Sequence, residues 1–220
     1  MSDYPPLQRN KSYSRTWQNV EEVRKYSKKR YSSLDQRFVS WCERKIVNKM
    51  LNKIKLPDST LLDIPTGYGR FTQLFLENDF DITNADLNLY ALLYQREQHL
   101  GTANSVVANV LDIPFKNNQF DVVFNFRLLQ HFKTNKERCT FLKELHLTTK
   151  KWAIVSVYIK SNLHIITQKI SSRKRKMTMI DLDVWREEVT NEGFKIVESR
   201  RAIPFFHAQM IFLLEKIVIR

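Results

Sequence analysis

The chain has 220 residues and a net charge of +13, with 43% hydrophobic and 12% aromatic residues. This composition excludes a wholly disordered chain, and the length suits one well-buried domain with appendages rather than two domains. No apolar run approaches the roughly 18 residues of a membrane span, and the first residues lack the apolar core of a signal peptide. We therefore expect a soluble, intracellular protein of the cytoplasm.

The positive charge is concentrated in two segments. Residues 1–57 contain 14 Lys and Arg against 5 Asp and Glu, and residues 160–176 contain 6 against none. The remainder of the chain is close to neutral. Such a distribution predicts an acidic substrate or surface, such as phosphate, carboxylate, nucleic acid or anionic lipid, although charge that serves only solubility is the alternative.

The chain contains two cysteines, Cys42 and Cys139. They lie far apart, and neither belongs to a C-x-x-C motif or to a spacing typical of metal ligands. We therefore expect two buried, reduced thiols rather than a disulfide, and we predict no metal site.

Residues 1–57 are predicted to form a helical extension. Apolar residues, including Phe38 and Trp41, recur at spacings of three and four from residue 20 to residue 54, with a break at residues 32–33. This pattern indicates one short and one long amphipathic helix with lysines and arginines on the outer faces. Residues 57–58 then end the helical region.

The rest of the chain alternates between strand and helix. Short apolar segments predict strands at residues 61–64, 80–86, 104–110, 120–126, 152–158, 194–199 and 210–219. Amphipathic segments predict helices at residues 70–78, 89–99, 133–148 and 181–192. The alternation indicates an α/β fold, a doubly wound, mostly parallel seven-stranded sheet with an antiparallel C-terminal strand. Ligands of such sheets bind at the carboxyl ends of the strands.

A glycine turn follows the first strand. Gly67 and Gly69 let the backbone turn tightly and approach a ligand without interference from a Cβ atom. The helix after them presents free N–H groups and the positive end of its dipole to that ligand. The dinucleotide pattern G-x-G-x-x-G is incomplete here because its first glycine is absent, so the turn alone is a weak signal.

Three acids stand at the ends of three successive strands. They are Asp63 in the first strand, Asp86 at the end of the second and Asp112 just after the third. Asp86 follows Gly67 by 19 residues, a distance at which an acid can accept both hydroxyls of a ribose. Because these strand ends meet at one edge of a parallel sheet, we predict that the three carboxylates line one nucleoside site.

Residues 63–71, Asp86, residues 111–115 and residues 120–123 together resemble the successive motifs of the seven-stranded (class I, Rossmann-like) S-adenosylmethionine-dependent methyltransferases. The resemblance covers about residues 59–219. It implies a methyltransferase domain at residues 58–220, with a basic insertion at about 159–179. The basic extension at residues 1–57 would supply lid-like helices. Pro65 replaces the usual first glycine of the family, although a residue with fixed φ can still form the turn.

The resemblance also implies S-adenosylmethionine as the cofactor and assigns roles around it. Gly67 and Gly69 would let the loop pass under the methionine part, with Asp63 near its amino group. Asp86 would hold the ribose hydroxyls. A dehydrogenase that binds nicotinamide competes for the same crevice, but the incomplete glycine pattern and the Leu-Asp-Ile-Pro-Phe element at residues 111–115 disfavour it.

Further roles follow for the third and fourth strands. The resemblance implies that Asp112 accepts from the adenine amino group while the N–H of Ile113 meets the ring. Asn125 and Phe126 would flank the methionine moiety and the sulfonium. The full set implied for the cofactor is Asp63, Pro65, Gly67, Gly69, Asp86, Leu87, Asp112, Ile113, Asn125 and Phe126.

The candidate catalytic residue is His131, just beyond the fourth strand. A histidine there can titrate near neutral pH and serve as a general base for a hydroxyl nucleophile. Alternatively, His131 only caps the next helix or packs beneath the cofactor. Arg30, Arg37 and Arg127 are the candidate substrate-binding residues, and for Arg127 an ion pair with a structural acid is the alternative.

Three functions remain open at this stage. The first is a methyltransferase for a small-molecule, sugar-linked or lipid-linked anionic acceptor, because both basic segments would surround the mouth of the site. The second is a nucleic-acid methyltransferase, in which clustered cations hold phosphates and aromatic side chains stack a base. The third is a binding module with this fold and no catalysis. The intact glycines and acids favour an enzyme.

Overall fold

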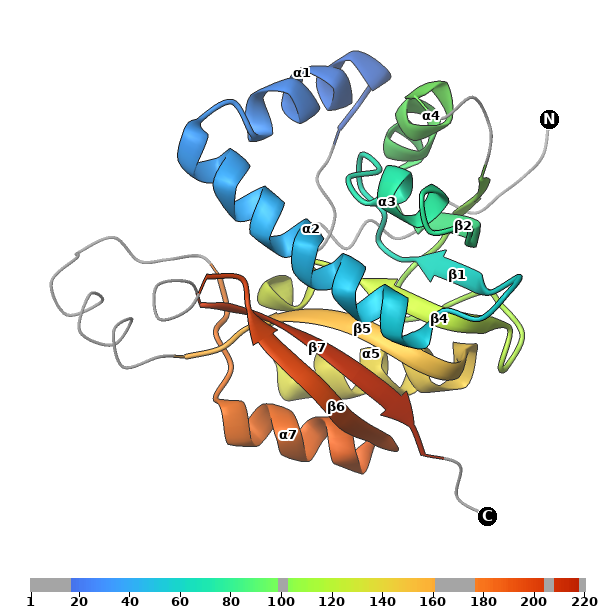
Figure 1. The fold of residues 1–220 in the computed structure, drawn as a ribbon, viewed down its shortest axis with the longest axis vertical. Helices are drawn as coiled ribbons and strands as arrows, with labels where there is room; N and C mark the ends of the chain where they lie inside the picture. The colour runs from blue at the N-terminus through green and yellow to red at the C-terminus, as the bar shows by residue number, and fades with distance from the viewer. Residues whose placement is uncertain (1–16, 99–102, 161–176, 204–207, 218–220) are drawn as a thin grey trace, which may run out of the picture.

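The computed structural model describes residues 17–98, 103–160, 177–203 and 208–217. Its strands are β1 (Thr60–Asp63), β2 (Asp81–Asp86), β3 (Asn104–Val107), β4 (Phe120–Asn125), β5 (Thr149–Tyr158), β6 (Phe194–Arg201) and β7 (Gln209–Lys216). They form one seven-stranded sheet in the order β3-β2-β1-β4-β5-β7-β6 (Figure 1). Strand β7 runs antiparallel to both of its neighbours, and the pairs from β3 to β5 are parallel. The predicted fold class is confirmed.

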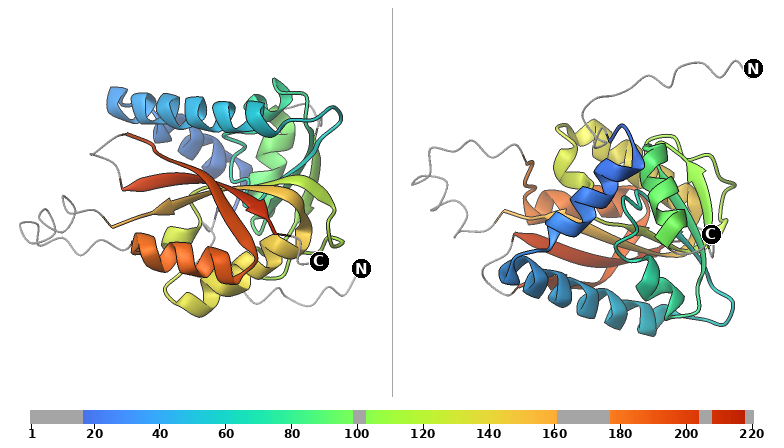
Figure 2. Two further views of the ribbon diagram at one scale, coloured as in Figure 1. Left: turned by 60° about the horizontal axis from the view of Figure 1, so that its bottom comes forward. Right: turned by 90° about the horizontal axis from the view of Figure 1, so that it is seen from above.

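Helices cover both faces of the sheet (Figure 2). They are α1 (Val20–Arg30), α2 (Leu34–Ile54), α3 (Thr72–Leu76), α4 (Leu89–Gln98), α5 (Asn135–Thr148) and α7 (Leu182–Asn191), with a 3₁₀ helix η1 (Leu129–His131). Residues of α2 and α3 share one hydrophobic cluster with the sheet, and residues of α5 and α7 share the other. The sheet is therefore buried on both sides.

Strand β4 shows why the apolar runs in this sequence are strands. Val122 and Phe124 belong to the cluster under α2 and α3, whereas Val123 belongs to the cluster over α5 and α7. Successive side chains of a strand point to opposite faces, so a strand that is covered on both sides is apolar at nearly every position. The continuous apolar run at residues 120–126 is the sequence signature of that position in the sheet.

Several element boundaries differ from the sequence prediction. Strand β3 ends at Val107 rather than at residue 110, because Asn109 starts a turn: its Oδ1 accepts from the N–H of Leu111 and its carbonyl accepts from the N–H of Asp112, both at 3.1 Å. The helix after the glycine turn is only Thr72–Leu76, not residues 70–78. The basic insertion expected at 159–179 lies mostly outside the described residues.

Helix α2 has two different halves. Val47, Met50 and Leu51 in its C-terminal half are fully buried against the sheet. Phe38 and Trp41, which share the helical spacing, are instead 54% and 57% exposed in the N-terminal half. The predicted long helix is present, but at 3.6 residues per turn Phe38 and Trp41 lie on the face opposite to Val47 and Met50, so they do not continue its inward face. In the described part of the chain, no helix has the length and apolar character to cross a membrane.

Both cysteines are free, as predicted, and each is only half-buried. Cys42 lies on α2 and Cys139 lies on α5. Burial raises the pKa of both thiols, which keeps them protonated at neutral pH.

Trp185 provides a test of the core over α5 and α7. Its side chain is fully buried and its ring lies 5.8 Å from that of Phe212 on β7. Trp185→Ala leaves a cavity in this core, so we expect urea denaturation to show a loss of about 3–5 kcal/mol of unfolding free energy. The adjacent Val184 is 42% exposed, and Val184→Ala should change that free energy by less than about 0.5 kcal/mol. Equal effects of the two substitutions would contradict this assignment.

Candidate active site

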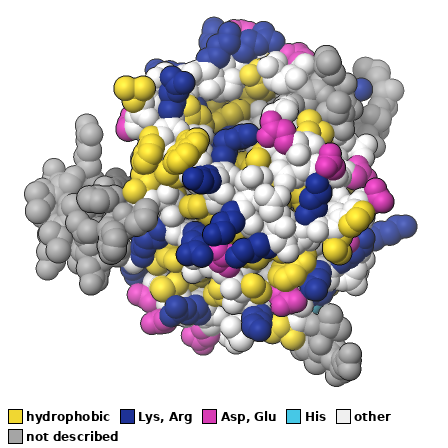
Figure 3. Space-filling view, in the orientation of Figure 1, with side chains coloured by type: hydrophobic (Ala, Val, Ile, Leu, Met, Phe, Trp, Pro, Cys, Tyr) yellow, Lys and Arg dark blue, Asp and Glu magenta, His cyan; other side chains and the backbone are white. Residues whose placement is uncertain are grey.

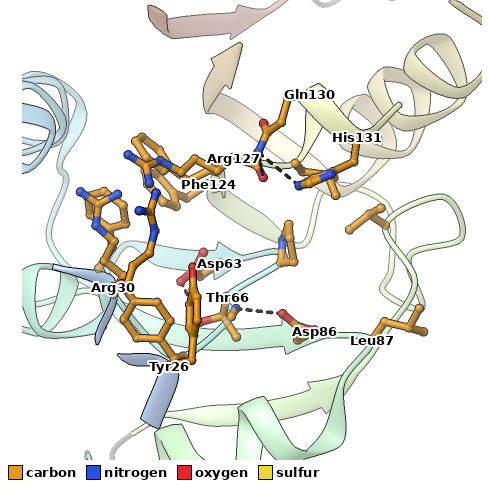
Figure 4. Close-up of a pocket in the computed structure, with 18 of the residues that line it drawn as sticks. Tyr26, Arg30, Asp63, Thr66, Asp86, Leu87, Phe124, Arg127, Gln130 and His131 are labelled. Carbon is orange, nitrogen blue, oxygen red and sulfur yellow. Dashed lines mark hydrogen bonds between the residues drawn. The ribbon is translucent and has the colours of Figure 1, made fainter. Parts of the chain in front are cut away.

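A cavity opens above the carboxyl ends of β1, β2 and β4 (Figure 4). Helix α1 supplies the facing wall: Tyr26 and Arg30 reach toward the cavity from that side, opposite Leu87 beyond β2. The Tyr26 ring stands edge-on to Tyr68 of the glycine turn, with ring centroids 5.8 Å apart. The predicted lid-like helices thus contact the loop that the sequence marked as the ligand-binding turn.

Asp63 lies at the end of β1 and is only 2% exposed. The Thr66 hydroxyl donates to Asp63 Oδ2 at 2.9 Å, and Gln95 Nε2 of α4 donates to the Thr66 oxygen at 2.9 Å. Burial raises the pKa of Asp63 to about 8, and the nearby Asp86 carboxylate adds to that rise. This carboxyl group therefore holds a proton more tightly than a carboxyl group in water does.

Asp86 ties the end of β2 to the glycine turn. Its Oδ2 accepts from the N–H of Gly67 and its Oδ1 accepts from the N–H of Asn88, both at 2.8 Å. Burial raises the pKa of Asp86, although these backbone donors oppose the rise. Both carboxylates line the cavity, as predicted, while their binding roles stay predictions.

The two glycines of the turn have different reasons to be glycine. Gly67 has φ +59° and lines the cavity, and a Cβ atom built there meets nothing within 4 Å. Its missing side chain leaves a cradle open to a ligand. Gly69 has φ +78° and does not line the cavity, and a Cβ atom there would lie 2.6 Å from Cγ of Gln95. Gly69 is therefore required by the contact between the turn and α4 rather than by a ligand.

The third predicted acid is displaced from the site. Asp112 is exposed and does not line the cavity, because the turn at Asn109 carries the chain outward after β3. The N–H of Ile113 donates to Glu144 Oε2 at 2.9 Å, so it is not directed to a ring in the cavity. Asn109 and Val110 line the cavity instead. Neither Asp112 nor Ile113 lines the cavity in this structure, and their roles toward the adenine stay predictions.

The end of β4 contributes one of its two predicted residues. Phe126 lines the cavity. Asn125 is buried beside it and does not line the cavity, since its Nδ2 donates to the carbonyl of Ile64 at 2.7 Å. Asn125 therefore joins β4 to the chain after β1, just before Pro65, which does line the cavity.

A buried carboxylate on α2 joins two arginines above the cavity. Glu43 is fully buried and forms ion pairs with Arg70, which follows the glycine turn, and with Arg127, which follows β4, the latter at 2.7 Å. Burial alone would lower the pKa of Arg127, but Glu43 together with Tyr31 and Tyr158 more than offsets this and raises it. Arg127 Nη1 also donates to the Tyr31 hydroxyl at 3.1 Å. Of the two roles considered for Arg127, the ion pair with a structural acid is present.

The other two candidate arginines are separated. Arg30 lines the cavity, and its guanidinium lies 5.2 Å from the ring centroid of Tyr31. Among the described residues it has no acidic partner. Arg37 is exposed on α2 and does not line the cavity, so the structure does not bring it to the candidate substrate site.

His131 lies at the rim of the cavity, at the end of η1, with an exposed side chain. Gln130 Nε2 lies 3.3 Å from His131 Nε2 and donates to the carbonyl of Arg127. Because an amide nitrogen can only donate, the nearby ring nitrogen of His131 acts as the acceptor in this contact, which leaves the proton on Nδ1. This contact orients the ring of His131, and the catalytic role of this residue stays a prediction.

Sequence reasoning missed several residues that line this cavity or support its walls. Glu43 gave no signal because one acid among the many charges of a long basic helix looks like part of its solvated face. Thr66 and Gln95 carried no motif of their own. Asn109 had a usable signal, since asparagine after a strand favours a turn.

Comparison with known protein families and solved structures agrees with the fold described above. Residues 62–156 match a family model described as a methyltransferase domain. No curated protein matches the chain in sequence.

Solved structures show the same fold. The magnesium protoporphyrin IX methyltransferase of Synechocystis PCC 6803, with bound S-adenosylhomocysteine, superposes with a TM-score of 0.75 at 13% identity, over 89% of this chain and 93% of that one. An S-adenosylmethionine-dependent methyltransferase of Clostridium acetobutylicum gives 0.68 at 11% identity, over 90% and 98%. One from Methanosarcina mazei gives 0.67 at 15% identity, over 77% and 98%.

Residues 62–156 therefore match a methyltransferase domain, and the chain has the class I, Rossmann-like fold of S-adenosylmethionine-dependent methyltransferases. The domain implies S-adenosylmethionine as the cofactor. Within the described residues, no group of His, Cys, Asp and Glu side chains is placed to hold a metal ion.

The raised pKa of Asp63 predicts a pH-dependent stability. The folded protein keeps the Asp63 proton up to pH about 8, whereas the unfolded chain loses it near the usual value of 3.8. The folded state thus binds more protons in this range, so this contribution to the unfolding free energy is present below pH about 4 and is lost as pH rises toward 8. Urea denaturation across this range should show the fall.

The matched variants for that measurement are Asp63→Asn and Asp58→Asn. Asp63→Asn cannot ionise and should flatten the pH profile, while Asp58→Asn, at an exposed position, should leave it unchanged. An Asp63→Asn profile as steep as that of the original chain would show that another group causes the fall.

Proposed function

We propose that this protein transfers the methyl group of S-adenosylmethionine to a small-molecule, glycan-linked or lipid-linked acceptor that carries an anionic group. The observation that carries the proposal is the division of charge in one cavity. Two buried carboxylates, Asp63 and Asp86, line its inner end, and three arginines, Arg30, Arg70 and Arg127, line the side under α1 and α2. A cationic ligand group and an anionic one are thus accommodated at different ends.

The inner end suits the cofactor. Asp63 would accept from its amino group, and Asp86, whose position is fixed by two backbone donors, would accept from the ribose hydroxyls. The open space above Gly67 leaves room for a ligand against the backbone. Leu87, Asn109 and Val110 would flank the adenine. When bound, S-adenosylmethionine supplies a methyl group on a sulfonium that is already activated toward a nucleophile.

The other end suits the acceptor. Arg70 and Arg127 share the single charge of Glu43, and Arg30 adds a third cation, so this wall has a net positive charge. It would hold a carboxylate or phosphate group of the acceptor. His131 would take the proton of a hydroxyl acceptor on Nε2 once the acceptor displaces the Gln130 amide from that nitrogen. When the methyl donor is already activated, most of the rate enhancement comes from the cavity walls, which hold the acceptor in line with the methyl group.

Calorimetric titration with S-adenosylmethionine, S-adenosylhomocysteine and NAD tests the cofactor. We expect micromolar binding of the first two and no binding of NAD. Gly67→Ala should weaken that binding by about tenfold or more, because the new Cβ fills the cradle and strains a backbone at positive φ. Val184→Ala on α7 is the control and should bind as the original chain does. Binding of NAD alone, or no binding of any of the three, would refute the proposal.

Two substitutions test the acceptor end once a methylated product is found. Arg30→Gln should raise the KM for an anionic acceptor by about tenfold and leave cofactor affinity unchanged, since it removes a charge-assisted hydrogen bond. His131→Ala should lower kcat by about 100-fold or more and spare both affinities. Turnover of His131→Ala at the original level would make the residue structural. Preferred methylation of RNA or DNA over small anions would favour the nucleic-acid alternative.

A further inference from the structure

Three apolar side chains of α2 face solvent together. Leu34, Phe38 and Trp41 are 81%, 54% and 57% exposed, and they stand at positions i, i+4 and i+7 of one helix. The rings of Phe38 and Trp41 stack with centroids 6.0 Å apart. We call these three residues the outer stripe. Figure 3 shows hydrophobic side chains gathered over this end of α2, with Lys and Arg side chains beside them.

The outer stripe is not part of the fold's interior. At 3.6 residues per turn, positions 34, 38 and 41 lie on the face of α2 opposite to the buried positions 43, 47, 50 and 54. The helix therefore has one apolar face for the sheet and a second for which the described residues provide no cover. A contiguous exposed patch with two large side chains of this kind is typical of an interaction surface.

Cations surround the outer stripe. Lys45 extends over the Trp41 ring, with Nζ 4.9 Å from its centroid, and Arg37 is exposed between Leu34 and Trp41. Lys28 and Lys29 are exposed in the last turn of α1, directly before α2. Asp35 is the acid exposed in this half of α2. An apolar centre with Trp and Phe inside a positive rim is the composition of helices that bind at the surface of anionic membranes.

We propose that the outer stripe docks the protein on the surface of an anionic lipid membrane. Leu34, Phe38 and Trp41 would enter the interface between head groups and acyl chains, where an indole ring is favourable, while the rim cations contact lipid phosphates. A second copy of this chain is a poorer occupant, because two basic surfaces repel each other.

The position of the stripe links it to the cavity. Arg30 and Tyr31 line the cavity and lie just before Leu34 in the chain. A membrane bound at the stripe would therefore lie next to the wall that carries the positive charge. The docking inference rests on the exposed surface alone. If both the inference and the proposed function hold, the acceptor would be carried by a lipid.

Vesicle flotation tests the inference with full-length protein. Vesicles of phosphatidylcholine mixed with phosphatidylglycerol should carry the protein, and vesicles of phosphatidylcholine alone should carry at least about tenfold less. The double variant Phe38→Ser/Trp41→Ser should lose about tenfold or more of the binding to the anionic vesicles. The matched control, Leu93→Ser/Val184→Ser, replaces exposed apolar residues of α4 and α7 and should bind as the original chain does.

Two further measurements keep the outcomes distinct. Both double variants should retain S-adenosylmethionine binding in the titration, which separates loss of docking from loss of fold or of the proposed function. The double variant Arg37→Gln/Lys45→Gln should weaken binding to the anionic vesicles and leave binding to the phosphatidylcholine vesicles unchanged. Equal binding of Phe38→Ser/Trp41→Ser and the original chain, no flotation of the original chain, or a dimer that this variant disrupts would each overturn the inference.

Discussion

The buried carboxylate of Glu43 is the interaction on which the arrangement of the site depends. A charge that is fully removed from water is tolerated only with partners, and breaking such a pair costs about 3–5 kcal/mol. Its two partners come from different places: Arg70 from the glycine turn and Arg127 from the chain after β4. Helix α2 is thereby fixed against both the loop that faces the cofactor end and the segment that leads to His131. The position of helix α2 and the arrangement of the cavity walls therefore depend on the same two ion pairs.

The same ion pairs also explain how one small cavity can hold opposite charges. Asp63 is held by the Thr66 hydroxyl and Asp86 by two backbone donors, so the inner end presents two acids that would pair with a cationic ligand group once that group displaces the Asp63 proton. The arginines are supported from above by one carboxylate, which leaves an excess of positive charge on that side. Neither end neutralises the other, because each has its own supporting groups. The two ends of the cavity therefore favour ligand groups of opposite charge. A ligand with a cation and an anion at separate ends fits the cavity in one orientation.

The sequence was sufficient for what depends on local pattern. Alternating strands and helices, the glycine turn and the acids of β1 and β2 were all predictable, because each rests on a short-range rule of periodicity or turn chemistry. Asp112 and Ile113 do not line the cavity, since one turn at Asn109 changes which side chains reach it. Glu43 and Gln95 depend on contacts between segments distant in sequence. Phe38 and Trp41 recur at helical spacing, but on the face of α2 opposite to its core residues. Spacing gives the period of a helix, but only the tertiary contacts decide which face is buried.

The two halves of α2 also restrict how the cavity can exchange its ligands. The C-terminal half cannot move away from the sheet without exposing Val47, Met50 and Leu51 to water. Helix α1 buries a single residue, Val23, so displacing α1 exposes far less apolar surface to water. The part of the cavity wall that α1 supplies can therefore move at a lower free-energy cost than the part that α2 holds through Glu43.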